Sequence, residues 1–148
     1  IPVIDAGLYR VSIEGRVSKP LKLSLADLQS YEQHSMICAL QCAGNRRHTM
    51  RTLLKEVQGI DWFEGAVMNC KWKGPRLRDV LLQAGLDIGQ SAGTQTHVEF
   101  SCHQNPSQET DWYGTSIPLE LAMAPDAEVI IALEVATSRP QPSLGGLY

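Results

Sequence analysis

Apolar and polar residues alternate near the start of the chain. In LYRVSIEG (residues 8–15), apolar side chains occupy positions 9, 11 and 13, and polar side chains occupy the positions between them. A two-residue period predicts a strand with one buried face. Longer apolar stretches predict further strands at MICALQ (36–41), GAVMNCKW (65–72) and THVEF (96–100), and a fully buried strand at EVIIALEV (128–135).

Three segments carry helix signals and predict short helices: SLADLQSY (24–31), GPRLRDVLLQAG (74–85) and IPLELAMAP (117–125). In the first, Ser24 and Asp27 have the spacing of an N-cap and a first-turn acid. In the second, Pro75 suits the first turn, four apolar residues share one face, and Gly85 suits a left-handed stop. The third lies between two prolines, which bound a helix on both sides.

The order of these elements favours an α+β fold with mixed sheets and short helices. Strands and helices alternate, but the connections are long and irregular, as in HQNPSQETDWYGTS (103–116), so a regular doubly wound sheet is not predicted. There are no internal repeats. We expect one domain over residues 1–135, followed at 136–148 by a loose tail rich in proline, glycine and serine.

The composition limits the classes of protein to which the chain is expected to belong. The 148 residues are 43% apolar and 20% charged, with a net charge of -3, so neither nucleic acid nor a membrane is an expected partner. No apolar run approaches the roughly 18–20 residues that span a bilayer. Because the chain begins at Ile1, we expect a processed form or a fragment. The four cysteines have no C-x-x-C spacing, which favours reduced thiols in an intracellular protein, with Cys38, Cys70 and Cys102 as small core residues.

The segment LQCAGNRRHTM (40–50) is the main candidate for chemistry. A buried-looking strand leads into Cys42, a Gly-Asn turn, and the paired Arg46 and Arg47. Guanidinium groups bind carboxylate, phosphate, nitrate or sulfite, and fixed positive charge favours the thiolate, which is the nucleophilic and metal-binding form of cysteine. The residues alone leave an anion-handling thiolate site and a structural turn both open. Arg51 and Lys55 are expected to form a solvated face.

Other chemistry is less favoured by the sequence. The chain has no P-loop, no G-x-G-x-x-G, no G-x-S-x-G and no H-E-x-x-H motif. Cys102 and His103 are adjacent, but a loop cysteine beside a solvated histidine is favoured over a zinc site.

The same segment resembles the molybdenum-cofactor domain of the sulfite oxidase and eukaryotic nitrate reductase family. LQCAGNRR is close to the cysteine motif of that family, and the likeness covers residues 1–135. It continues through IPVIDAGLYRVSIEG, GIDWFEGAVMNCKWKGPRLRDVLLQAG and YGTSIPLELAMAPDAEVIIALEV. The resemblance implies a sulfite-oxidase-like molybdopterin-binding fold, which we expect to be incomplete here.

The resemblance also implies roles for single residues. Cys42 matches the cysteine whose thiolate ligates molybdenum, Arg47 an arginine that binds the oxyanion substrate, and Trp62 a tryptophan near the substrate pocket. The implied activity is oxidation of sulfite to sulfate by oxo transfer at a molybdenum–molybdopterin cofactor, with electrons passed to a haem domain or partner. Full-length relatives are homodimeric and occur in mitochondria or the cytosol.

Departures from the family pattern keep two alternatives open: nitrate reduction on the same domain, and a catalytically inactive truncated fragment. The F-x-R-x-H and H-G-x-P-x-R segments of the family have no counterpart. Gln58 stands where a lysine is expected, and Gln104 where an acidic residue is expected. We therefore expect weak retention of the pterin cofactor and an exposed apolar sheet edge.

Overall fold

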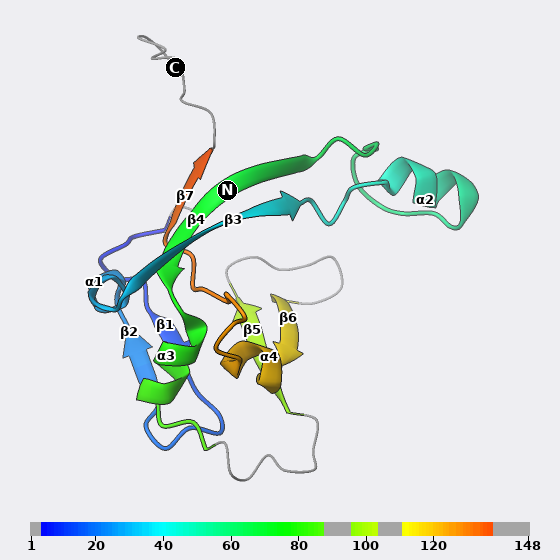
Figure 1. The fold of residues 1–148 in the computed structure, drawn as a ribbon. Coiled ribbons are helices and arrows are strands. Elements are labelled where there is room, and N and C mark those ends of the chain that lie inside the picture. The colour runs from blue at the N-terminus through cyan, green and yellow to red at the C-terminus, as the bar shows by residue number, and fades with distance from the viewer. Residues whose placement is uncertain (1–3, 88–95, 104–110, 138–148) are drawn as a thin grey trace. The chain divides into compact units, whose positions relative to one another are not determined.

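The computed structural model describes residues 4–87, 96–103 and 111–137, which belong to two compact units. The first unit comprises Ile1–His34 and Gly74–Ala132, and the second comprises Ser35–Lys73 and Leu133–Tyr148. Both combine short helices with small sheets, so the expected α+β class is confirmed (Figure 1). Among the helices that the structure describes, none has the length and apolar character needed to cross a bilayer.

In the first unit, a short sheet leads into a capped helix. Strand β1 (Val11–Ile13) pairs antiparallel with β2 (Leu21–Leu23), and helix α1 (Leu25–Ser30) follows. The predicted cap is confirmed, because Ser24 Oγ accepts a hydrogen bond from the Asp27 amide at 3.2 Å and Asp27 Oδ2 accepts one from the Ser24 amide at 2.8 Å. This capping box satisfies two helix-terminal amides, which explains why the helix begins there.

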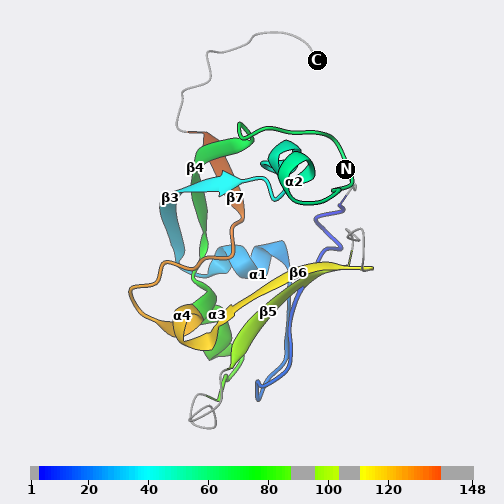
Figure 2. The same ribbon diagram turned by 90° about the vertical axis from the view of Figure 1, so that its right-hand side faces the viewer.

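The core of the first unit lies around helices α3 (Leu77–Gln83) and α4 (Leu119–Met123). Strands β5 (His97–Cys102) and β6 (Tyr113–Pro118) form an antiparallel ribbon that leads into α4 (Figure 2). Leu77, Leu81 and Ala122 are buried together, with apolar residues of β1, β5 and β6 packed against them. As predicted, a left-handed glycine follows α3: Gly85, with a φ of 70°, comes directly after the C-cap residue Ala84.

Two predictions for this unit are wrong in detail. Residues 128–133 do not form a fully buried strand: they are at most half-buried, and only an isolated bridge joins Ile130 to Arg76. Hydrogen bonds from Ile131 to Pro75 and from Leu77 to Val129 keep the segment extended beside the chain at 75–77. Pro75 ends strand β4 and is buried, and the N-cap of α3 is Arg76.

The second unit is a three-stranded sheet with a helix at one end. The strand order is β3 (Gln33–Gln41), β4 (Val67–Pro75) and β7 (Glu134–Thr137), and β4 pairs antiparallel with β7. Helix α2 (Arg47–Leu53) and a long loop connect β3 to β4 (Figure 1). Ala136 and Thr137, expected in the tail, continue strand β7, and residues 138–148 lie outside the described part of the chain.

Little of the second unit is buried. Among its described residues only Cys70 is buried, at 1% exposure, so its expected core position is confirmed. Cys38 is exposed, so that core assignment was wrong, whereas Cys102 in the first unit is half-buried. Several large apolar side chains of this sheet are exposed, which agrees with the expected apolar surface: Ile37, Leu40, Val67, Met68 and Val135.

Candidate functional site

A tight corner follows strand β3. The Asn45 amide donates to the Cys42 carbonyl at 3.0 Å and the Arg47 amide to the Gly44 carbonyl at 3.2 Å, which turns the chain through the predicted Gly-Asn turn. Arg46 then adopts a left-handed conformation with φ 65°, which L-residues other than glycine seldom adopt. As the N-cap of α2, Arg46 sets the direction in which the helix leaves the corner.

The Asn45 side chain fastens this corner to the chain just before β4. Its Nδ2 donates to the Glu64 carbonyl at 2.9 Å, and its Oδ1 accepts from the Ala66 amide at 3.0 Å. The Cys42 amide donates to the Ala66 carbonyl at 2.9 Å. These bonds link residues about 20 positions apart in the sequence, so the direction of the corner is fixed by its partner segment as well as by the local turn.

The Cys42 thiol lies at the surface of this corner. It forms no disulfide, it is exposed, and the Gly44 amide points at its sulfur with an N–S distance of 3.4 Å. The sulfur of Cys42 therefore has one backbone N–H within hydrogen-bonding reach. The surrounding hollow is lined mainly by apolar residues of β3, β4 and the turn before β4: Leu40, Gly65, Ala66, Val67 and Met68.

Arg47 and Trp62 converge on Gly44. A methyl group built on Gly44 would lie 2.9 Å from both Nη2 of Arg47 and Nε1 of Trp62. The two nitrogens are therefore within twice that distance of each other, beside the residue that donates to the Cys42 sulfur. The three residues that the resemblance singled out thus lie around one glycine.

A second glycine, Gly59, also lies against the Arg47 side chain. Its φ is 108°, and a methyl group there would overlap Nη1 of Arg47. The same guanidinium donates to the Ile60 carbonyl at 2.8 Å. The arginine side chain therefore lies against the backbone of the loop that precedes Trp62.

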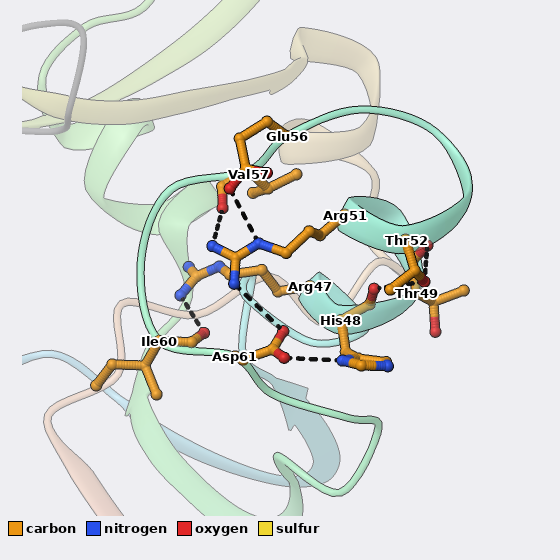
Figure 3. A network of polar contacts seen from close by, with 9 residues as sticks. All are labelled: Arg47, His48, Thr49, Arg51, Thr52, Glu56, Val57, Ile60 and Asp61. Carbon is orange, nitrogen blue, oxygen red and sulfur yellow. Dashed lines mark hydrogen bonds and ion pairs between the residues drawn. The ribbon is translucent and has the colours of Figure 1, made fainter.

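Helix α2 holds this loop through further polar side chains (Figure 3). Arg51 donates to the Val57 carbonyl at 2.9 Å, and its Nε lies 3.1 Å from a Glu56 oxygen. The prediction of a solvated Arg51 was therefore wrong, since its side chain is engaged with the loop. Lys55 is exposed, as expected, and lies beyond the end of α2.

The sequence also singled out four further positions. Gln58 is exposed, and Gln104 lies outside the described residues. Cys102 and His103 belong to the first unit, and the described residues contain no cluster of three or more metal-binding side chains. Sequence reasoning placed Asn45 in the turn but did not foresee the bonds of its side chain, and it did not single out Gly59. The only signals for them are a glycine ahead of the Trp loop and an asparagine in a turn.

The fold is similar to that of a known redox protein. The crystal structure of the sulfane dehydrogenase SoxCD from Paracoccus pantotrophus matches 92% of this chain with a TM-score of 0.66, over 31% of that chain and at 20% sequence identity. At that identity, the likeness indicates a shared fold. The chain therefore belongs to the same class of fold as the matched part of that structure.

The sequence narrows the class to a family. The pattern described as "Oxidoreductase molybdopterin binding domain" matches residues 1–145, and the chain belongs to that family. It is 42% identical to the mitochondrial sulfite oxidase of Homo sapiens over 136 residues, which are 91% of this chain and 24% of that protein. It is 35% identical to the sulfite oxidase of Arabidopsis thaliana (91% and 35%) and 31% identical to the NADH nitrate reductase of Ulva prolifera (89% and 15%). The chain spans about a quarter of the length of its mammalian relatives.

Proposed function

We propose that this chain supplies the thiolate and one oxyanion-binding corner of a molybdopterin-dependent enzyme that oxidises sulfite to sulfate. The observation that carries the proposal is the convergence of Arg47 and Trp62 on Gly44, beside the exposed Cys42 thiol. The identity to sulfite oxidases, 42% for the human protein, supports sulfite as the substrate.

The corner suits a small oxyanion for electrostatic reasons. Only one nitrogen of the Arg47 guanidinium donates to a described residue, the Ile60 carbonyl, and within the described part of the chain no group accepts from Trp62 Nε1. A guanidinium edge and an indole N–H are thus both available as donors beside Gly44, whose amide points at the thiol. Charge-assisted donors of this kind bind sulfite or sulfate oxygens, and the indole ring would exclude water from them.

Among the described residues, the side chain of Cys42 fits the role of a ligand to the molybdenum of the cofactor. Cys42 provides an exposed thiol outside any disulfide, with an amide aimed at its sulfur, and soft sulfur suits molybdenum. When bound, the cofactor supplies the oxo transfer and accepts two electrons. The residues of this chain would hold the metal at Cys42, orient the anion at Arg47 and shield it with Trp62. Because one thiolate is a weak anchor, we expect the 148-residue chain alone to retain little cofactor.

The partners and location of the whole protein are also proposals. We infer a haem group, on another domain or on a partner, as the electron acceptor, and a homodimer as the assembled form. The human and Drosophila melanogaster relatives are named mitochondrial, which favours mitochondria over the cytosol for this protein.

The proposal is tested on the gene product that contains this chain, purified from a host that makes the molybdenum cofactor. We expect molybdenum by elemental analysis and sulfite-dependent reduction of a haem acceptor. Cys42→Ser should lose the sulfite-dependent activity, while Cys38→Ser, a change at another exposed cysteine in the same unit, should keep it. Arg47→Ala should raise KM for sulfite by about ten- to a hundredfold, since one charge-assisted interaction is removed.

Nitrate reduction is the second candidate, because the Ulva prolifera nitrate reductase is 31% identical over 89% of this chain. Parallel assays with sulfite and with nitrate plus a reductant separate the two. Turnover of nitrate alone would replace the sulfite proposal. A purified protein without molybdenum would instead favour the third reading, a catalytically inactive fragment.

A further inference from the structure

His48 contacts three consecutive residues of the loop that carries Trp62. Its backbone amide donates to the Trp62 carbonyl at 2.9 Å. Its ring nitrogen Nδ1 lies 2.8 Å from Oδ2 of Asp61, the residue before the tryptophan. Its ring packs against Phe63, the residue after, with centroids 4.5 Å apart and planes inclined at 31°. One side chain of α2 thus engages both neighbours of Trp62 while its backbone engages Trp62 itself.

Asp61 lies between two donors of the same helix (Figure 3). Beyond its bond to His48, its second oxygen lies 4.0 Å from Nη1 of Arg51. Arg51 in turn donates to the Val57 carbonyl, four residues earlier in the loop. The carboxylate therefore connects the loop to two residues of α2, and its charge is partly balanced there.

We infer that His48 and Asp61 are positioning residues for Trp62, through which they orient the oxyanion site. A backbone bond at the Trp62 carbonyl alone leaves the peptide free to rotate about that bond. Anchors on the residues before and after it fix the rotation, and with it the direction of the Trp62 Cα–Cβ bond. The inference rests on the proposed function, because the position of Trp62 matters for catalysis only if that site binds an oxyanion.

Both side chains are accessible enough to be exchanged without leaving a cavity. The His48 side chain is 37% exposed and the Asp61 side chain 41% exposed. His48→Asn places an amide nitrogen where the ring Nδ1 stood and so keeps a donor for Asp61, whereas His48→Ala removes it. Asp61→Asn keeps the shape and removes the charge. Glu56→Gln is the matched control, since the ion pair of Glu56 is with Nε of Arg51 and involves neither His48 nor Asp61.

The test labels the chain with 5-fluorotryptophan and records fluorine NMR spectra. The three tryptophans are Trp62, Trp72 and Trp112, and each signal is assigned by a Trp→Phe change. We expect His48→Ala and Asp61→Asn to move or broaden the Trp62 signal while the other two stay in place. His48→Asn keeps the contact with Asp61 but loses the packing on Phe63, so it should restore the wild-type Trp62 position in part, and Glu56→Gln should leave that position unchanged. Sulfate should shift the wild-type Trp62 signal, with half-saturation raised several-fold in His48→Ala.

An unchanged Trp62 signal in His48→Ala and Asp61→Asn would overturn the inference. So would equal displacement of the Trp72 signal, since Trp72 lies in the sheet of the same unit and its movement would indicate a general loss of structure. Failure of sulfate to shift wild-type Trp62 would count against the proposed oxyanion site. The positioning roles would still be decided by the spectra without sulfate.

Discussion

Two glycines allow the side chains of the candidate site to approach the backbone. Gly44 leaves room for Arg47 and Trp62 together, and Gly59 leaves room for Arg47 in a conformation with φ 108°. A side chain at either position would displace the groups that we assign to oxyanion binding. The identity of the polar residues is therefore insufficient for the site, because its geometry depends on two missing Cβ atoms.

Gly59→Ala is predicted to damage the site and to destabilise the chain. Strain from the positive φ costs about 1–2 kcal/mol, and the new methyl group would displace the guanidinium that donates to Ile60. Urea unfolding should show the loss of stability, and the proposed enzyme should show a raised KM for sulfite. For the measurement of stability, Gly65→Ala is the matched control in the same loop, because a methyl group there meets no atom within 4 Å. Equal effects of the two changes would contradict this account.

At the scale of residues, the sequence identified the candidate site residues but not the residues that hold them in place. The motif and its resemblance pointed to Cys42, Arg47 and Trp62, which the structure brings to one corner. The role of His48 could not be read from the sequence. Its contacts with Asp61 and Phe63 join positions 13 and 15 residues away through a loop without regular structure, and no periodicity predicts such contacts.

At the scale of elements, local signals predicted helices better than strands. The capping box of α1 and the left-handed Gly85 after α3 are local interactions, so a few residues determine them. The apolar run at 128–135 was wrong as a buried strand, because apolar composition does not indicate how many partners the backbone has. Its first half is extended and half-buried beside 75–77, and only Glu134–Thr137 forms a strand, at the edge of the second sheet.

The capping box predicts a dependence of stability on pH. The Ser24 hydroxyl, followed by its backbone amide, donates to the Asp27 carboxylate and lowers the pKa of Asp27 below its ordinary value of 3.8. Because the folded state favours the ionised form, this contribution is present above about pH 4 and is lost as pH falls through the lowered pKa. Asp27→Asn should therefore be less stable than wild type in urea at neutral pH, and the difference should shrink near pH 3.

Ser24→Ala provides the complementary measurement. It removes the hydroxyl donor but leaves the carboxylate, so its stability relative to wild type should follow the same pH trend. A difference between Asp27→Asn and wild type that is equally large at both pH values would show that the carboxylate charge is not what the cap uses.

At the scale of the whole molecule, burial is unequal between the two units. The buried apolar residues of the described chain lie in the first unit apart from Cys70: Leu23, Leu28, Leu77, Val80, Leu81, Ala84, Leu119 and Ala122. The candidate site lies in the second unit, whose described residues bury almost nothing. Apolar burial is the main source of folding free energy, so the site belongs to the part with less intrinsic stability.

Hydrogen exchange on the 148-residue chain tests this difference. We expect slow exchange for amides of α3, which lies in the buried core, and fast exchange across residues 35–66, including α2. Mass spectrometry after short and long labelling times would resolve the exchange rates of α3 from those of residues 35–66. Leu81→Ala, which should cost about 2–5 kcal/mol in the core, should speed exchange in α3 with little effect on α2. Protection of α2 equal to that of α3, lost together in Leu81→Ala, would show one cooperative unit. If the two units instead unfold separately, a ligand that binds only the folded corner should raise protection at 42–66, because binding to the native form stabilises it by mass action.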